Sequence, residues 1–187
     1  MYKKVLITGG CGFVGHHFVE YFLRNTNWKI IILDKLNYAS NGFDRLRDIK
    51  AFNDKRVLIL TADFSDVLSE GVKQEIGEVQ YIFHLGAESH VDNSIANPEP
   101  FIKSNVLGTM NMLNFALNLS QLKCFFYCST DEVFGALPDG GKEKFNESWP
   151  FRPNSPYAAS KAACDCLTRA YFKTYGLPVS VTNCSNN

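Results

Sequence analysis

The chain has 187 residues, of which 45% are hydrophobic and 20% are charged, and its 19 Lys and Arg residues balance its 19 Asp and Glu residues. This length supports one globular domain with a sizeable core. The balanced charge gives no basic tract for nucleic acid or an anionic membrane surface. No apolar run is long enough to span a membrane, and the N-terminus lacks the pattern of a signal peptide. We therefore expect a cytoplasmic protein that binds neither nucleic acid nor a membrane.

Short apolar runs alternate with helical patterns along the chain. The helical patterns cover residues 13–26, 98–119 and 157–175, and the runs that predict strands cover residues 5–8, 30–33, 57–60, 81–87, 124–129 and 179–183. Runs without polar alternation are typical of strands buried on both faces. The alternation predicts an α/β fold in one domain over residues 1–187, a doubly wound Rossmann-type parallel sheet with helices on both faces.

Two segments near the end of the chain have clear local signals. Ser155 can cap the helix over 157–175, Pro156 suits its first position, and Gly176 can end it. The irregular stretch 135–156 precedes this helix. Loops of that length inside a compact domain tend to be functional.

The six cysteines do not predict a metal site or a disulfide. Cys124 and Cys128 share one face of a strand but lie roughly 13 Å apart. Cys164 and Cys166 lie two apart on a helix and point in different directions. Neither pair can chelate one metal ion or close a disulfide, which favours small core residues in a reducing compartment.

A glycine-rich turn follows the first predicted strand. TGGCGFVG spaces Gly9, Gly12 and Gly15 where a chain turns tightly and its backbone approaches a pyrophosphate at a helix N-terminus. Asp34 ends the second predicted strand, where a carboxylate accepts hydrogen bonds from ribose hydroxyls and repels a 2′-phosphate. The pattern predicts NAD rather than NADP, although the adjacent Lys35 softens this preference.

Tyr157 and Lys161 lie four residues apart on the capped helix and therefore share one face. A free tyrosine titrates near 10, and bringing its pKa to about 7 takes about 4 kcal/mol of stabilisation of the phenolate. A nearby ammonium and a cationic nicotinamide ring can supply that stabilisation together. Ser129 or Thr130, at the end of the fifth predicted strand, can hold a substrate hydroxyl.

Asp131 and Glu132 follow the same strand side by side. Two adjacent carboxylates gain nothing from burial, so they are either a solvated turn or a pair that transfers protons. Close carboxyl groups separate their titrations, which suits a reaction that needs one acid and one base. Neighbours on an extended strand point to opposite faces, so the second interpretation requires a bend at the strand end.

The chain resembles the extended short-chain dehydrogenases/reductases, and among them the nucleotide-sugar 4,6-dehydratases. The segments that carry the resemblance are TGGCGFVG, LDKLNYASN, HLGAESHVDNSI, STDEVFG, NSPYAASKAACD and YGLPVSVTNCSNN. STDEVFG is the most specific, because related epimerases usually carry small residues where this chain has Asp131 and Glu132. The resemblance implies NAD as cofactor and dTDP-glucose or UDP-glucose as substrate.

The resemblance also implies a role for each catalytic residue, the full set being Thr130, Asp131, Glu132, Tyr157 and Lys161. Tyr157 removes the proton of the sugar 4-hydroxyl while hydride passes from C4 to NAD. Glu132 then takes the C5 proton, and Asp131 protonates the departing 6-hydroxyl. Hydride returns to C6 and Glu132 returns its proton to C5. The pathway implied is the synthesis of a deoxysugar.

Further residues match positions at which related enzymes bind ligands. Expected cofactor-binding residues are Gly9, Gly12, Phe13, Val14, Gly15, Asp34, Lys35, Asn37, Asp63, Phe64, Leu85, Gly86, Ala87, Tyr157, Lys161 and Asn183, with Asp63 placed at the adenine ring. Expected substrate-binding residues are Glu88, Ser89, Thr130 and Asn186. Asn105 matches a residue that braces the active site in related enzymes.

Several positions depart from the pattern of these enzymes. Cys11 and Gly86 stand where alanine is usual, Asn93 where arginine is common, and Phe134 where tyrosine is common. Related chains are also substantially longer, so we expect the C-terminal substrate region to be absent here. The helices over 98–119 and 157–175 pair across a two-fold axis in related enzymes, which implies a homodimer.

Two other functions fit parts of the pattern. One is an NAD-dependent nucleotide-sugar 4-epimerase, against which Asp131 and Glu132 argue, because an epimerase abstracts no C5 proton. The other is a non-catalytic NAD-binding module. The intact Tyr157, Lys161, Asp131 and Glu132 argue against this module for a longer parent protein, and it stays open for the chain of this length.

Overall fold

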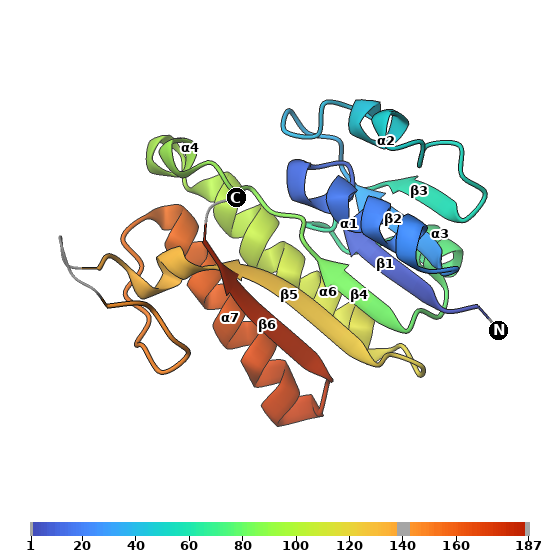
Figure 1. Cartoon of the computed structure of the whole chain (residues 1–187). Helices are drawn as coiled ribbons and strands as arrows, with labels where there is room; N and C mark the ends of the chain where they lie inside the picture. The colour runs from blue at the N-terminus through green and yellow to red at the C-terminus, as the bar shows by residue number, and fades with distance from the viewer. Residues whose placement is uncertain (1, 138–142, 186–187) are drawn as a thin grey trace.

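The computed structural model describes residues 2–137 and 143–185. Its centre is a six-stranded sheet in the order β3-β2-β1-β4-β5-β6, and every neighbouring pair is parallel. The strands are β1 (Lys4–Thr8), β2 (Lys29–Asp34), β3 (Val57–Thr61), β4 (Tyr81–His84), β5 (Cys124–Thr130) and β6 (Val179–Cys184). The predicted doubly wound parallel sheet is confirmed (Figure 1).

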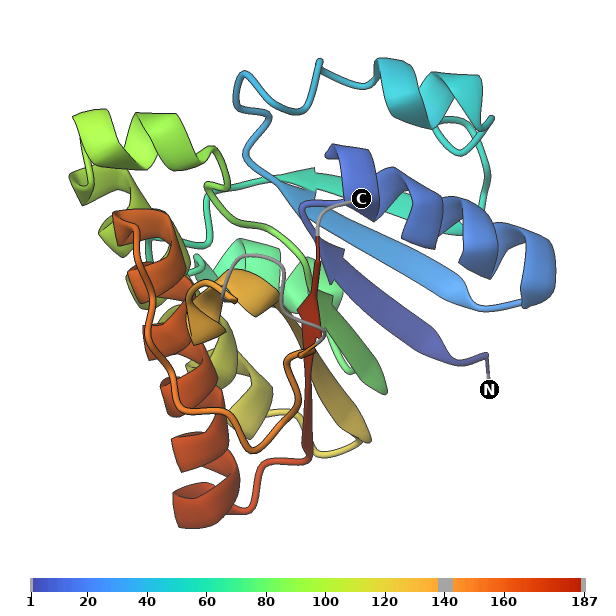
Figure 2. The same ribbon diagram turned by 60° about the vertical axis from the view of Figure 1, so that its left-hand side comes forward.

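Helices cover both faces of the sheet, as Figure 2 shows from the side. They are α1 (Phe13–Asn25), α2 (Asp44–Asp48), α3 (Glu70–Ile76), α4 (Val91–Ala96), α5 (Glu99–Phe101), the π-helix η1 (Ile102–Leu107), α6 (Gly108–Leu117), the 3₁₀ turn η2 (Asp131–Phe134) and α7 (Pro156–Tyr175). The sequence pattern missed α2, α3 and α4, because helices of five to seven residues are too short for a periodic signal.

The strands bury alternate residues in two separate cores. Val5 and Ile7 of β1 pack on the α1 side, whereas Leu6 between them packs on the side of α6 and α7. Both sets are fully buried, which is why these strands show no polar alternation in the sequence.

Two predicted elements differ from the structure. The strand expected over 81–87 ends at His84, because Leu85 to Ala87 leave the sheet where the backbone of Gly86 passes the glycine turn. The helix expected over 98–119 is continuous but contains the π-helical turn η1. Such turns widen a helix locally, and this one carries Asn105, whose side chain bonds the backbone of Glu88 and the hydroxyl of Ser160.

The start of α7 is fixed by hydroxyl groups. The Ser155 hydroxyl accepts a hydrogen bond from the backbone N–H of Ala158 at 3.0 Å, as its sequence position predicts. Ser94 of α4 accepts the N–H of Tyr157 at 3.1 Å. Gly176 ends the helix in a left-handed conformation with φ of 71°.

No helix in the described part of the chain is both long and apolar enough to cross a membrane.

His84 ties the sheet to the helical layer behind it. Its Nδ1 lies 2.8 Å from the Thr8 hydroxyl of β1, and its Nε2 lies 3.1 Å from the Thr109 hydroxyl of α6. Burial, assisted by the charge of Lys161, lowers the pKa of His84 to about 3. The imidazole is therefore neutral in the folded protein at physiological pH, whereas in the unfolded chain it takes up a proton near pH 6.5.

We predict that His84 makes folding sensitive to acid. Because its folded pKa is below its unfolded pKa, its contribution is complete above about pH 6.5 and falls as the pH drops toward 3. Between pH 7.5 and pH 5 this group alone removes about 2 kcal/mol of unfolding free energy. Urea denaturation at both pH values measures the loss. His84→Gln should show a smaller loss, whereas His90→Gln, at an exposed histidine, should match the parent. Equal pH dependence in His84→Gln and the parent would contradict the assignment.

Candidate active site

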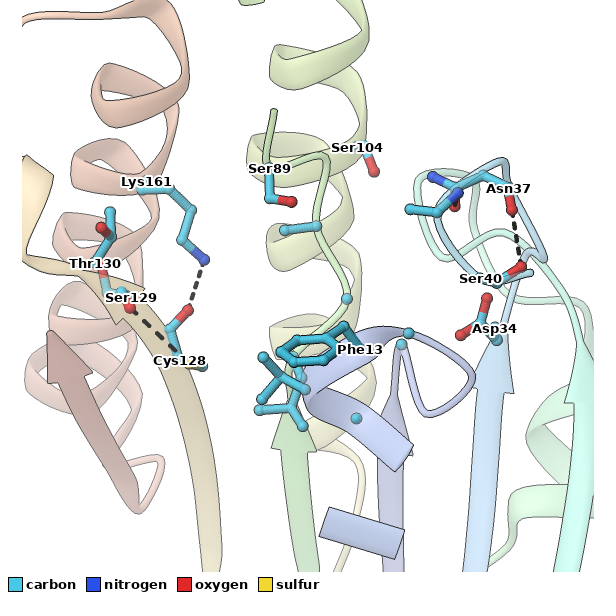
Figure 3. Close-up of a pocket in the computed structure, with 18 of the residues that line it drawn as sticks. Phe13, Asp34, Asn37, Ser40, Ser89, Ser104, Cys128, Ser129, Thr130 and Lys161 are labelled. Atoms are coloured by element: carbon cyan, nitrogen blue, oxygen red, sulfur yellow. Dashed lines mark hydrogen bonds between the residues drawn. The ribbon is translucent and has the colours of Figure 1, made fainter. Parts of the chain in front are cut away.

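A cavity of about 330 Å³ lies along the carboxyl ends of the strands. Open parallel sheets bind ligands at this edge. Figure 3 shows Asp34 and Asn37 at one side of it, Phe13 on the glycine turn in the middle, and Thr130 and Lys161 at the other side. Fourteen of the expected cofactor-binding residues line it: Gly9, Gly12, Phe13, Val14, Gly15, Asp34, Lys35, Asn37, Phe64, Leu85, Gly86, Ala87, Tyr157 and Lys161.

The glycine turn forms a cradle that side chains cannot enter. A Cβ at Gly15 would overlap the carbonyl oxygen of Gly9. Gly9 has φ of 69°, and a Cβ there would lie 2.7 Å from the Cα of Gly86. The turn is closed by a hydrogen bond from the Gly12 N–H to the Gly9 carbonyl at 3.0 Å. The N-terminus of α1 thus opens directly on the cavity, an arrangement that suits a phosphate group.

Asp34 is held rigidly at the end of β2. Its Oδ2 accepts the N–H of Cys11 at 2.9 Å, and its Oδ1 accepts the N–H of Leu36 at 2.9 Å. Each carboxylate oxygen keeps a further lone pair for a ligand hydroxyl.

Lys35 is paired with two acids. Its Nζ lies 2.9 Å from Glu88 and 3.9 Å from Asp63, and Asn37 donates to the same Glu88 oxygen at 3.0 Å. A lysine engaged in this way is a poor anchor for a 2′-phosphate, so Lys35 softens the preference set by Asp34 less than its position in the sequence suggests.

Three predicted ligand-binding residues among those described are not brought to the cavity wall. Asp63 accepts the N–H of Ser65 at 2.8 Å, and Glu88 faces Lys35 and Asn37. Asn183 points toward Thr130 and Asp165. The cavity lining therefore contains none of Asp63, Glu88 and Asn183. It does contain the expected substrate-binding residues Ser89 and Thr130. Asn186 falls outside the described residues.

Six residues that sequence reasoning did not assign also line the cavity: Ala39, Ser40, Ser104, Cys128, Cys184 and Ser185. Ser129, which it offered as an alternative to Thr130, lines it as well. Cys128 and Cys184 stand at the ends of the neighbouring strands β5 and β6, so their place at the strand ends was the signal available for them. Ser104 lies within η1, and no local pattern marks it.

Tyr157 and Lys161 both face the cavity from α7, as their spacing predicts. The ammonium of Lys161 donates to the carbonyl of Cys128 at 2.6 Å and lies 4.4 Å from the centre of the Tyr127 ring. Burial lowers the pKa of Lys161. Burial first, and then Glu132 and Cys128, raise the pKa of Tyr157 to about 12. That the Lys161 ammonium and a cationic nicotinamide ring together bring the pKa of this phenol to about 7 stays a prediction for the cofactor-bound protein.

The bend that the acid pair requires is present. Thr130 ends β5, its hydroxyl accepts the N–H of Glu132 at 3.3 Å, and the chain turns into η2. Both acids are half-buried and raise the pKa of Tyr157 by their charge, Glu132 more than Asp131. Burial and then Asp131 raise the pKa of Glu132 itself, which strengthens this carboxylate as a base when it is ionised. The acids stand beside the cavity near Tyr157 and do not line it.

Within the described residues, no cluster of three or more His, Cys, Asp or Glu side chains can hold a metal ion. The polar groups that converge on the cavity are hydroxyls, two lysines, an aspartate, an asparagine and backbone amides. This set suits hydrogen bonding to a nucleotide.

Phe64 packs between two glycines at the base of the cavity. A Cβ at Gly86 would lie 2.6 Å from Cε1 of this ring, and a Cβ at Gly108 would lie 2.6 Å from its Cδ2. The ring also contacts His84 edge-on, with centroids 5.1 Å apart. The glycine at position 86, unusual for the resembled enzymes, is therefore explained by the ring that occupies the space of its side chain.

We predict that Gly86→Ala lowers the unfolding free energy by about 1–3 kcal/mol, because the methyl group overpacks against Phe64. Phe64→Leu in the same chain should recover part of this loss, so that the double variant is more stable than the sum of the single changes predicts. Denaturant unfolding measures all three variants. Gly71→Ala is the control, since a Cβ at this exposed position in α3 meets no atom closer than 4.0 Å. Strict additivity of the two changes would refute the packing explanation.

The fold and the site together define an extended short-chain dehydrogenase/reductase, with its glycine turn after β1 and its Tyr-x-x-x-Lys pair on α7. The family model described as GDP-mannose 4,6 dehydratase matches residues 6–187. The chain belongs to this family.

Curated relatives carry a narrower description. The chain is 44% identical over 192 residues to a probable dTDP-glucose 4,6-dehydratase of Sinorhizobium fredii, and 40% identical over 199 residues to a dTDP-glucose 4,6-dehydratase of Escherichia coli. Each match covers 98% of this chain and 53% or 54% of the relative. The chain therefore spans about half the length of the curated relatives that it matches.

Solved structures agree with the fold. The dTDP-glucose 4,6-dehydratase of Streptomyces venezuelae, solved with NAD bound, has a TM-score of 0.87 at 40% identity, covering 97% of this chain and 55% of that chain. The UDP-glucose 4-epimerase of Thermus thermophilus, solved with NAD, has a TM-score of 0.81 at 31% identity, covering 96% of this chain and 54% of that chain. Of these two, the dehydratase is the more similar in sequence.

Proposed function

We propose that the protein is a dTDP-glucose 4,6-dehydratase, a hydro-lyase that converts dTDP-glucose to dTDP-4-keto-6-deoxyglucose with NAD as cofactor. The observation that carries the proposal is the position of the acid pair. The turn at the end of β5 brings Asp131 and Glu132 close enough to Tyr157 for their charges to raise its pKa. An epimerase has no use for a carboxylate at this position, because it removes no proton from carbon.

The cavity fits NAD. The glycine cradle and the N-terminus of α1 suit the pyrophosphate, and Asp34 suits the ribose hydroxyls. Tyr157 and Lys161 stand at the opposite end of the same cavity, where the sugar and the nicotinamide would meet. Asp34, with Lys35 paired to Glu88, favours NAD over NADP. When bound, the cofactor supplies a hydride acceptor and donor and the positive charge of its ring.

The residues of the chain divide the proton transfers among them. Tyr157 takes the proton of the sugar 4-hydroxyl, and Thr130 or Ser129 orients that hydroxyl. The pKa of Tyr157, about 12, leaves almost none of the phenol ionised at pH 7. Lowering this pKa to about 7 takes about 7 kcal/mol of added stabilisation of the phenolate. Positive charge beside the phenol lowers its pKa, so Lys161 has to share this work with the charge that arrives with the cofactor.

Glu132 removes the C5 proton once C4 carries a ketone, because the ketone makes that proton acidic. Its raised pKa makes it a stronger base than an exposed glutamate. Asp131 protonates the 6-hydroxyl as it leaves. As C6 is reduced, Glu132 protonates C5, and the proton that it delivers has exchanged with solvent. The sum of these steps is the loss of one water.

We propose a homodimer as the working unit, formed through the outward faces of η1, α6 and α7. Large apolar side chains are exposed along these helices, among them Ile102, Leu107, Leu117, Phe172 and Tyr175. An apolar helical face of this kind suits a second copy of the same surface.

Incubation of the purified protein with NAD and dTDP-glucose tests the function directly. The expected product is lighter than the substrate by one water, as mass spectrometry reports. A product of unchanged mass with an inverted C4 centre identifies an epimerase instead. NAD binding without turnover identifies a non-catalytic module and refutes the proposal for this chain.

The variant Glu132→Gln should separate oxidation from elimination. The amide cannot take the C5 proton, so water loss should slow by about 10²–10⁴-fold. Tyr157 and Lys161 remain, so C4 is still oxidised and the near-ultraviolet absorbance of reduced nicotinamide should accumulate. Glu143→Gln, at an exposed glutamate that does not line the cavity, is a charge-matched control and should behave as the parent. Loss of cofactor reduction in Glu132→Gln would show that Glu132 is not the C5 base.

A further inference from the structure

The inward face of α7 carries a third ionisable residue beyond the catalytic pair. Asp165 lies one turn after Lys161 and two turns after Tyr157, on the same side of the helix, and it is only 6% exposed. It does not line the cavity. A buried carboxylate is costly unless hydrogen bonds compensate it, so its partners indicate what it does.

Asp165 bonds a residue that bonds the end of β5. The side-chain amide of Asn183, on β6, donates to Asp165 Oδ2 at 3.0 Å and to the carbonyl of Thr130 at 3.3 Å. The Thr130 hydroxyl in turn accepts the N–H of Glu132 at 3.3 Å. A continuous chain of hydrogen bonds therefore runs from α7 through β6 to the turn that carries the two acids.

The carboxylate decides which way the Asn183 amide faces. An ionised carboxylate only accepts hydrogen bonds, and an amide nitrogen has two hydrogens to donate. With the nitrogen toward Asp165, its second hydrogen meets the Thr130 carbonyl. The flipped amide would set its oxygen against both the carboxylate and that carbonyl. Asp165 thus selects the amide orientation that holds Thr130.

We propose that Asp165 is a positioning residue that acts through Asn183 to hold the end of β5, from which Asp131 and Glu132 project. The consequence for catalysis rests on the dehydratase function proposed above. In this role the amide of Asn183 bonds the strand end and does not line the cavity, and the cofactor contact expected from the sequence stays a prediction.

The surroundings of Asp165 make the loss of its acceptor oxygens consequential. Burial raises the pKa of this carboxyl, whereas the hydroxyl of Ser129, then the Asn183 hydrogen bond and the charge of Lys161, oppose that rise. In the described part of the chain, the Oδ1 atom of Asp165 and the neighbouring hydroxyl of Ser129 are buried, and neither makes a well-formed hydrogen bond. A buried polar cluster that already contains unpaired atoms loses order strongly when one of its remaining hydrogen bonds is removed.

Amide hydrogen exchange tests the positioning role without reference to activity. In Asp165→Ala, exchange in the segment 129–135 should quicken by about tenfold, because the Asn183 amide loses its orientation. Asp165→Asn keeps an oxygen acceptor for Asn183 and should exchange at nearly the parent rate. Thr168→Val is the matched control, since its buried hydroxyl on the same helix has no partner among the described residues. Exchange in 129–135 that is unchanged in Asp165→Ala overturns the proposal.

A double variant checks the route of the effect. If Asp165 acts through Asn183, the pair Asp165→Ala and Asn183→Ala should quicken exchange in 129–135 no further than either change alone. Multiplied effects would mean that the two residues act independently, and they would overturn the proposal.

Turnover gives the second readout. With NAD and dTDP-glucose, Asp165→Ala should accumulate reduced nicotinamide, because displaced acids slow water loss more than C4 oxidation, and Asp165→Asn should restore turnover. A carboxylate that only fastened α7 to β6 would lower the unfolding temperature without this absorbance. If the parent protein loses no water from the sugar, the dehydratase function fails, and the exchange experiment still decides the role of Asp165.

Discussion

The turn at Thr130 is the constraint on which the candidate site depends. On a straight strand Asp131 and Glu132 would point to opposite faces of the sheet. Because the Thr130 hydroxyl caps the turn and Gly135 reverses the chain with φ of 93°, both acids stay at the carboxyl edge beside Tyr157. The reversal has no room for a side chain, since a Cβ at Gly135 would lie 2.6 Å from the Arg152 carbonyl. Arg152 thus closes the turn from outside, and the hydrogen bond of Asn183 to the Thr130 carbonyl holds its start from within.

Burial sets the electrostatics around this turn. It raises the pKa of Tyr157, lowers the pKa of Lys161 and lowers the pKa of His84 to about 3, so each group is pushed toward its neutral form. Negative charge from Glu132 adds to the effect on Tyr157. In such a site the phenol of Tyr157 keeps its proton until positive charge is placed beside it and lowers its pKa. The same burial keeps His84 neutral between its two threonines, where it supports the sheet.

Sequence reasoning predicted the features that depend on local pattern. The parallel sheet, the capped α7, the glycine turn and the shared face of Tyr157 and Lys161 all follow from periodicity, caps and spacing, and the structure has them. It failed where long-range contacts decide. The pairing of Lys35 with Glu88 joins residues 53 apart in the chain, and the bond of Asn183 to Asp165 joins two separate elements. The pKa of Tyr157 also depends on packing, which spacing along a helix does not report.

The central claim is that a carboxylate beside Tyr157 moves the C5 proton while hydride passes from C4 to C6 of one sugar. Turnover of dTDP-glucose carrying deuterium at C4, in ordinary water, measures this most directly. The account predicts a 4-keto-6-deoxy product with deuterium at C6, and the same reaction of unlabelled sugar in heavy water should place solvent deuterium at C5. Deuterium released to the solvent from C4, or a C5 hydrogen that never exchanges, would contradict it.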